Sequence, residues 1–327
     1  MGEFSVAKEQ QSENRMCLAD KIPLNTPLSM QLELASACNF RCKFCMHHDD
    51  INVKNGKLKL GVMQMDTFER AVKGISEFSQ KLKMITLQSR GESLLNPQIV
   101  EMTKFLKKAN VTEKIGLYTN GVLLTRNIAD GLIDAGLDVL HISIEGVNAA
   151  QYYDVTRTYV DFEELVNNIK YFYEHKTNTY LYVKIIDCGL SDKDKKIFKD
   201  TFKSISDNLF IEAPVDAWQG AGVDKIKLKE NRYNEKISKV DICPRIFFAM
   251  VVHYDGTVVA CDHDWSEEEP VGNINEESIS DIWVGKNMER IRQIHLKGQA
   301  DLVNRCKTCI QRRECLEKDN IDILLNK

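Results

Sequence analysis

The chain has 327 residues, of which 43% are hydrophobic and 28% are charged, an ordinary composition for a globular protein. The formal net charge is −4, from 44 Lys and Arg against 48 Asp and Glu, and the basic residues are scattered, so composition gives no case for a nucleic-acid partner. No apolar run approaches the ~20 residues of a membrane span, and the polar N-terminus lacks the apolar segment of a signal peptide. We therefore expect a cytoplasmic protein without a membrane partner.

Apolar, strand-like runs alternate with amphipathic, helix-like stretches between residues 30 and 214. The predicted strands cover residues 30–36, 83–89, 114–120, 138–146, 181–187 and 208–214. The helices predicted between them include 65–82, 97–110, 127–137 and 161–176. Strands that alternate with helices of this length indicate βαβ units and a parallel sheet. Six strands predict an α/β fold, a partial (β/α)6 TIM-like barrel, with its chemistry at the carboxyl ends of the strands.

A loop with three cysteines follows the first predicted strand directly. Cys38, Cys42 and Cys45 have the spacing C-x3-C-x2-C. A structural zinc site needs four ligands, and His47 or His48 is the local candidate for the fourth. A 4Fe–4S cluster on three cysteines would instead leave one iron open to bind a small molecule. Both interpretations remain open at the level of spacing.

The alternation of strands and helices ends near Trp218, and a second, smaller domain is expected to follow. Its predicted parts are a charged connector, a β-hairpin, a helix and a ligand-bearing loop, over residues 225–239, 243–264, 278–298 and 306–315. The Asp255-Gly256 pair is the turn signal of the hairpin, because glycine tolerates positive φ. We therefore divide the chain into a polar leader, the barrel and a small C-terminal domain, over 1–29, 30–220 and 221–327.

The cysteine loop resembles the C-x3-C-x-aromatic-C signature of the radical SAM enzymes, with Phe44 in the aromatic position. The resemblance implies a 4Fe–4S cluster on Cys38, Cys42 and Cys45 whose open iron chelates S-adenosylmethionine (SAM). Reductive cleavage of SAM would give a 5′-deoxyadenosyl radical that abstracts hydrogen from the substrate. It also implies an electron donor such as flavodoxin or ferredoxin.

Three further stretches at predicted strand ends resemble the SAM-contacting motifs of this family. Residues 88–97 stand where the family carries Gly-Gly-Glu-Pro, but Arg90 replaces the first Gly and Ser93 replaces Pro. Gly91 is expected to let the backbone approach SAM, and Glu92 to accept from its ammonium group. The residues expected to contact the adenosyl and ribose groups are Asn120, Ser143 and Glu145.

The cysteines of the last third of the chain resemble the SPASM/Twitch extension, which holds auxiliary iron–sulfur clusters. They are Cys243, Cys261, Cys306, Cys309 and Cys315, and Asp281-Ile282-Trp283 in the helix before the last three also fits. Two fully thiolate-ligated clusters would need eight cysteines, and the full pattern would place one at position 319, which is Asp319. We therefore predict one auxiliary 4Fe–4S cluster that carries electrons. Its ligands are Cys243, Cys261, Cys306 and Cys309, with Cys315 as an alternate or a bystander; a zinc ribbon with four cysteine ligands is the open alternative.

Two candidate catalytic residues lie after the fifth and sixth predicted strands. Cys188 is one, because in some radical SAM epimerases a cysteine returns hydrogen to the substrate radical; a bystander thiol is the alternative. Asp216 is the other, in a stretch whose polar side chains are expected to line a site. The same stretch contains Glu212, Trp218 and Gln219.

These features predict a radical SAM oxidoreductase that acts on a small polyol, such as a sugar, an aminocyclitol or a nucleotide-sugar. The outcome would be dehydrogenation, dehydration or epimerisation. The first alternative is a peptide-modifying radical SAM/SPASM enzyme, which forms cross-links or matures a sulfatase. The residues before the first strand, 1–29, are too few for the peptide-recognition domain that such enzymes often carry. The second alternative is a non-catalytic zinc-binding interaction protein.

Overall fold

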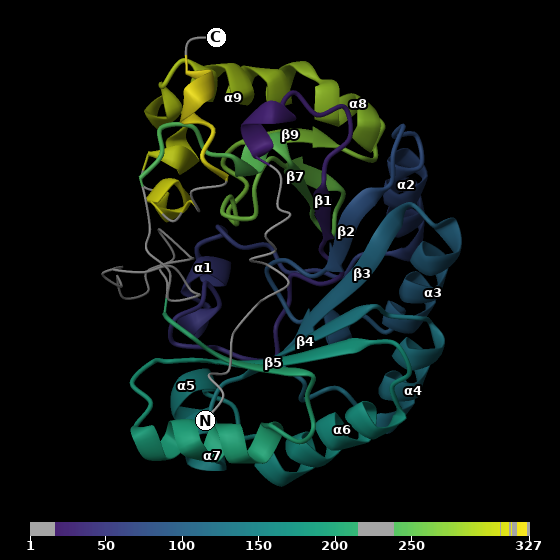
Figure 1. Cartoon of the computed structure of the whole chain (residues 1–327), viewed down its shortest axis with the longest axis vertical. Helices are drawn as coiled ribbons and strands as arrows, with labels where there is room; N and C mark the ends of the chain where they lie inside the picture. The colour runs from purple at the N-terminus through teal and green to yellow at the C-terminus, as the bar shows by residue number, and fades with distance from the viewer. Residues whose placement is uncertain (1–16, 215–238, 308, 314, 316–318, 326–327) are drawn as a thin grey trace.

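The computed structural model describes residues 17–214, 239–307, 309–313, 315 and 319–325. Within these residues, nine strands form one sheet in the order β6-β5-β4-β3-β2-β1-β7-β8-β9 (Figure 1). The strands are β1 (Ser29–Leu32), β2 (Leu82–Leu87), β3 (Thr112–Thr119), β4 (Val139–Ile144), β5 (Tyr180–Ile186), β6 (Asn208–Glu212), β7 (Ala249–Val252), β8 (Thr257–Val259) and β9 (Pro270–Asn273). All six predicted strands are present, and β1 to β6 are parallel to their neighbours.

Helices cover the outer side of the curved sheet and make it the predicted partial barrel. Figure 1 shows α2, α3, α4 and α6 in succession along that side. The α-helices are α1 (Ile51–Lys54), α2 (Met65–Ile75), α3 (Ile99–Ala109), α4 (Arg126–Asp134), α5 (Ala149–Thr156), α6 (Phe162–His175), α7 (Asp192–Phe202), α8 (Ile279–Val284) and α9 (Lys286–Leu296). The four predicted helices of the barrel correspond to α2, α3, α4 and α6.

Each strand separates an apolar outer face from a more polar inner face. On β4, Leu140, Ile142 and Ile144 are fully buried, whereas His141 and Ser143 between them are only partly buried. Residues two apart on a strand share a face, so the apolar set packs under the helices and the polar set faces inward. The sheet therefore offers polar groups on its concave side.

The C-terminal β-hairpin continues the sheet of the barrel. β7 pairs with β1 in parallel, from Ser29 opposite Ala249 to Leu32 opposite Val252. β8 returns antiparallel to β7 after Gly256, whose φ of +89° explains the glycine of the predicted turn. The boundary at residues 220 and 221 lies outside the described residues.

The prediction of one helix over residues 278–298 is wrong. The segment forms two helices, α8 and α9, which meet at Gly285. Gly285 has an extended backbone with ψ of 164° and precedes α9 as its N-cap. Glycine has the weakest helix preference after proline, so an interruption of the helix at this residue costs little free energy. None of the described helices combines the length and the apolarity needed to cross a bilayer.

We predict that Phe172→Ala destabilises the fold by about 3–5 kcal/mol, because it empties a fully buried position of α6 in the main core. Lys170→Ala on the same helix is the control, since its side chain is 55% exposed and its loss should cost less than about 0.5 kcal/mol. Urea unfolding followed by circular dichroism measures both. Equal midpoints for the two variants would contradict the assigned packing.

Candidate active site

The loop after β1 brings three thiols together. Cys38, Cys42 and Cys45 lie close enough that a charge on one raises the pKa of another, as Cys45 does for Cys38. Burial is the larger effect, and it raises the pKa of Cys38 to about 12 and that of Cys45 to about 11. The protein by itself therefore keeps these thiols protonated at neutral pH. A metal centre that takes thiolate ligands would supply the missing positive charge, so the residues fit such a group.

The three thiols after β1 are not as close together as the ligands of a single zinc ion. In a zinc site with Zn–S bonds of about 2.3 Å, neighbouring sulfurs lie about 3.8 Å apart. Among the residues that the structure describes, the group whose donor atoms all lie within 4.8 Å of one another is Cys261, Asp262 and His263, and the three thiols after β1 are more widely spaced. A 4Fe–4S cluster, whose irons are bridged by sulfides, is compatible with thiols that are farther apart than 4.8 Å.

His47, a candidate fourth zinc ligand, has a different role in the structure. It is buried, and its Nε2 donates to the carbonyl oxygen of Arg90 at 3.1 Å. Burial lowers the pKa of His47 to about 4, so the ring is neutral at pH 7. The contact joins the cysteine loop to the loop after β2.

Helix α5 holds the cysteine loop from the other side. The amides of Arg41 and Lys43 donate to the carbonyl oxygens of Thr156 and Val155 at 2.8 and 2.9 Å. Phe44, the aromatic residue of the cysteine signature, is partly buried and packs against the main core. The loop is therefore anchored through its backbone, which leaves the thiol side chains to bind a ligand.

Gly91 is packed against the cysteine loop. A β-carbon at this position would lie 2.2 Å from the carbonyl oxygen of Ala37 and 2.6 Å from that of Ala35. The next amide, of Glu92, donates to the same Ala37 oxygen at 2.8 Å. Glycine is thus needed here for the approach of two loops; the expected approach to SAM stays a prediction.

Glu92 connects the ends of β2 and β3. Its buried carboxylate accepts from the Leu94 amide at 2.9 Å, the Thr119 hydroxyl at 2.7 Å and the Asn120 amide at 2.8 Å. Burial raises the pKa of Glu92, and these hydrogen bonds oppose that shift. The side-chain amide of Asn120 donates to Asn39 in the cysteine loop at 2.7 Å. The predicted SAM-contacting residues of two strand ends are therefore brought together around the cysteine loop.

The ends of β4, β5 and β6 add a charged group on the inner face. Lys184 donates to Glu212 at 2.8 Å, and both side chains are about nine-tenths buried. Lys184 lies opposite Ser143 in the register, and its charge, like that of Glu212, acts on Glu145. Burial raises the pKa of Glu145 to about 7; Lys184 opposes this shift and Glu212 adds to it. Three ionisable groups therefore share one region next to the cysteine loop.

Sequence reasoning missed Lys184 and its neighbour His141 on this face. His141 stacks on Tyr118 with ring centroids 4.1 Å apart and meets Tyr182 edge-on at 5.0 Å. The signal was present in both strands, because Lys184 is a charged side chain within a largely apolar run and His141 alternates with apolar residues in β4. In a strand covered by helices on one face, such a residue marks the inner face.

The two predicted catalytic residues differ in what the structure describes. Cys188 follows β5 and is partly exposed, and burial raises its pKa to about 11, with Glu145 as a further cause. It therefore keeps the S–H hydrogen that the predicted donor role requires. Asp216 lies outside the described residues, as do Trp218 and Gln219.

Four cysteines of the C-terminal part also come together. Negative charge on Cys243 and Cys309 would raise the pKa of both Cys261 and Cys306, so the four thiols predicted as auxiliary-cluster ligands are neighbours. Burial is again the main reason that these values are raised. Cys315 is buried as well.

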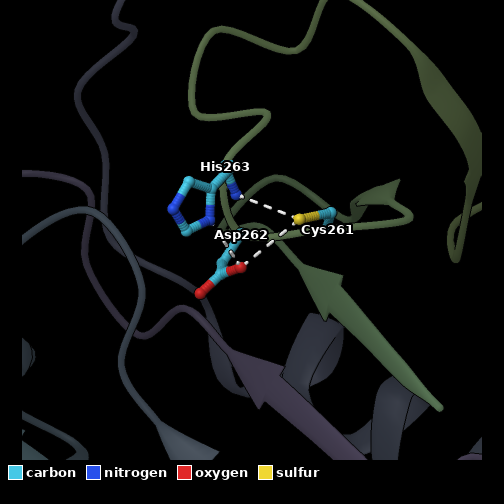
Figure 2. A group of neighbouring side chains, drawn as sticks. All are labelled: Cys261, Asp262 and His263. Atoms are coloured by element: carbon cyan, nitrogen blue, oxygen red, sulfur yellow. Dashed lines mark hydrogen bonds and ion pairs between the residues drawn. The ribbon is translucent and has the colours of Figure 1, made fainter. Parts of the chain in front are cut away.

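Figure 2 shows Cys261 with the two residues that follow it. The amide of His263 donates to the Cys261 sulfur at 3.4 Å, and His263 Nδ1 contacts Asp262 at 3.1 Å. The other oxygen of Asp262 pairs with Arg245 at 2.7 Å and accepts from Gln31 of β1 at 3.3 Å. The loop after β8 therefore contacts the inner face of the barrel directly beside a predicted cluster ligand.

Comparison with protein families identifies the family of the barrel and of the C-terminal segment. Residues 32–203, more than half of the chain, match the radical SAM superfamily. The chain belongs to the radical SAM superfamily. Residues 243–310 match the SPASM iron–sulfur cluster-binding domain, a segment that begins at Cys243, contains Cys261, Cys306 and Cys309, and ends before Cys315. The protein is thus a radical SAM enzyme with a C-terminal SPASM domain, and these two domains imply iron–sulfur clusters and SAM binding.

Curated relatives of this radical SAM enzyme match it to different extents. A probable GTP 3′,8-cyclase of Methanococcus maripaludis is 35% identical over 129 residues, 39% of this chain and 40% of that protein. The chain thus spans about 40% of the length of these cyclases. A tungsten-containing aldehyde ferredoxin oxidoreductase cofactor-modifying protein of Pyrococcus furiosus is 23% identical and aligns over 88% of both chains.

Solved structures of radical SAM enzymes share the fold. Streptococcus suis SuiB bound to precursor peptide SuiA has a TM-score of 0.66 and 13% identity, over 95% of this chain and 78% of that chain. BtrN in complex with AdoMet and 2-DOIA has a TM-score of 0.56 and 18% identity, over 86% of this chain and 92% of that chain. The predicted fold class is confirmed.

We predict that Gly91→Ala lowers the iron content after anaerobic reconstitution and lowers thermal stability by about 1–3 kcal/mol. The added methyl group meets backbone of the cysteine loop, which has to move. Gly116→Ala is the control, because its β-carbon first meets the flexible Met84 side chain at 3.4 Å. Iron analysis and thermal unfolding measure both variants, and a Gly91→Ala protein with full iron and an unchanged midpoint would contradict this packing.

Proposed function

We propose that this radical SAM enzyme oxidises a secondary alcohol of a small polyol, such as a sugar, an aminocyclitol or a nucleotide-sugar. The observation that carries the proposal is the buried Lys184–Glu212 pair on the inner face, beside Glu145 and the cysteine loop. When bound, the iron–sulfur clusters and SAM supply hydrogen-atom abstraction from the carbinol carbon and an acceptor for the second electron. The chain itself supplies binding, orientation and the proton acceptor.

The proposed ligands of the SAM-binding 4Fe–4S cluster are Cys38, Cys42 and Cys45. Those of a single auxiliary cluster are Cys243, Cys261, Cys306 and Cys309, with Cys315 as an alternate or a bystander. Residues 30–220 would form the barrel and 221–327 the auxiliary domain. The proposed SAM contacts are Phe44, Gly91, Glu92, Asn120, Ser143 and Glu145, and the electron donor would be a flavodoxin or a ferredoxin.

Glu212 is the proposed acceptor for the hydroxyl proton of the substrate. Oxidation of an alcohol to a ketone removes one hydrogen atom from carbon, one proton from oxygen and one further electron. The Glu212 carboxylate is held by Lys184 at 2.8 Å on the inner face and would accept that proton as a general base. Lys184, which is within hydrogen-bond distance of it, then holds the hydroxyl oxygen.

The charges of the inner face fit a sugar or an aminocyclitol better than a triphosphate. Near the carboxyl ends of the described barrel strands, Lys184 pairs with Glu212, and in the cysteine loop Arg41 pairs with Asp50 and Lys43 with Asp154. The roughly four negative charges of a triphosphate would need several unpaired cations to compensate for the loss of water. His141 beside Tyr118 and Tyr182 offers polar and aromatic surface of the kind that binds a hydroxylated ring.

The cofactor part of the proposal predicts about eight iron atoms per chain after anaerobic reconstitution, four in each cluster. Incubation with SAM and dithionite should release 5′-deoxyadenosine, and Cys45→Ala should abolish that release. Cys309→Ala should spare SAM cleavage more than product formation. Cys17→Ala, at an exposed thiol, is the control. About four irons in the wild-type protein would remove the auxiliary cluster from the proposal.

The substrate part predicts that a polyol probe, and no peptide, accelerates 5′-deoxyadenosine release. Glu212→Gln should lower ketone formation by about 10²–10⁴-fold while 5′-deoxyadenosine still forms, because it removes the base and leaves the shape. Lys176→Met is the matched control, since Lys176 pairs with Asp207 at 2.9 Å at the opposite end of the same strands. Chromatography of the ketone and of 5′-deoxyadenosine measures the ratio of ketone formed to SAM cleaved. Acceleration by a leader peptide instead would favour the peptide-modifying alternative.

A further inference from the structure

Arg90 is a buried cation at the place where the family motif has its first glycine. Its side chain is 1% exposed. An isolated charge at this depth would cost several kcal/mol, so its partners decide what it does. Those partners come from two different parts of the chain.

One edge of the Arg90 guanidinium pairs with the barrel. Nε donates to both oxygens of Glu33, at 2.7 and 3.2 Å, and Glu33 is 0% exposed. Glu33 follows β1 directly, and its amide donates to the carbonyl oxygen of Val252 at the end of β7. This half of the contact fixes Arg90 to the strand that precedes the cysteine loop.

The other half pairs with the loop that follows Cys261. Arg90 Nη1 donates to the Trp265 carbonyl oxygen at 3.0 Å and to Glu267 at 2.9 Å. The same Glu267 oxygen contacts His253 Nδ1 at 2.9 Å. Burial acts to raise the pKa of Glu267, but His253 and Arg90 hold it at about 2, so the carboxylate is ionised throughout the physiological range.

The backbone of Arg90 and the side chain of Trp265 also contact the three-cysteine loop. The Arg90 carbonyl oxygen accepts from His47, two residues after Cys45. Trp265 is buried together with Met46 and Leu58, and Cys45 packs against this group. One residue thus contacts the three-cysteine loop through its backbone and the auxiliary-cluster loop through its side chain.

We propose that Arg90 is a positioning residue that locks residues 261–267 of the auxiliary domain onto the three-cysteine loop. Its planar fork satisfies two carboxylates and one carbonyl at once, which an ammonium group cannot match in geometry. Loss of one partner would leave a buried charge without compensation. We therefore expect the contacts of Arg90 to be lost together rather than one at a time. These contacts of Arg90 would keep the distance between the two iron–sulfur sites constant, whatever the substrate is.

The test uses Arg90→Met and Glu267→Gln in the complete, anaerobically reconstituted protein. Hydrogen–deuterium exchange at residues 261–267 should become about tenfold faster in both variants, because the locked loop opens more often. Pulsed electron paramagnetic resonance on the reduced clusters should give a broader distribution of the distance between them. Glu267→Gln leaves the Glu33 pairing intact and serves if Arg90→Met does not fold.

Arg292→Lys is the matched control, because this arginine bonds only within the C-terminal part, to the Ile246 and Trp283 carbonyl oxygens, in the contacts the structure gives. It should leave exchange at 261–267 and the intercluster distance unchanged. Relative to Arg90→Met, Arg90→Lys should restore part of the protection of residues 261–267 from hydrogen exchange. It should not restore the contact with both oxygens of Glu33. Unchanged exchange and distance in Glu267→Gln would overturn the proposal, and so would equal acceleration in Arg292→Lys.

Discussion

The grouping of three largely buried thiols in one loop is the constraint on which the rest of the site depends. Without a bound metal centre, the raised pKa values of Cys38 and Cys45 keep them protonated, so the loop has to be held by contacts other than its own side chains. Those contacts come from α5, from the loop after β2 and from Asn120 after β3. Backbone hydrogen bonds hold the loop, and Gly91 allows the close approach of the loop after β2. The sulfurs of the loop are therefore left for ligation.

The parallel sheet gathers these partners because all six barrel strands end on the same side. Glu92 and Asn120 are 28 residues apart, yet they bond at 2.8 Å across adjacent strand ends. Lys184 and Glu212 meet in the same way at 2.8 Å across β5 and β6. Alternation along each strand puts these polar groups on the inner face and the apolar ones under the helices. The chemistry and the core thus use opposite faces of the same strands.

The auxiliary domain is joined to the barrel by more than a linker. β7 extends the sheet next to β1, Asp262 reaches Gln31 on the inner face, and Arg90 joins three carboxylate or carbonyl partners from both parts. Two kinds of contact restrain the junction between the barrel and the C-terminal domain. One is the hydrogen bonding between β1 and β7, and the other is the group of buried charges at the end of β1. These contacts join the part of the chain that contains the four thiols to the strand that precedes the three-thiol loop.

The sequence by itself determined the features whose partners are near in the chain. Periodicity predicted all six barrel strands, and the spacing of Cys38, Cys42 and Cys45 predicted a metal-binding loop, for zinc or a cluster, because these ligands lie within eight residues. It predicted one helix where Gly285 separates two, since a helical pattern does not reveal a glycine's local backbone angle. Only the tertiary structure decided what Arg90 and Lys184 do. Their partners, Glu33, Glu267 and Glu212, are 57, 177 and 28 residues away, and only folding brings such charges within hydrogen-bond distance, where burial makes pairing obligatory.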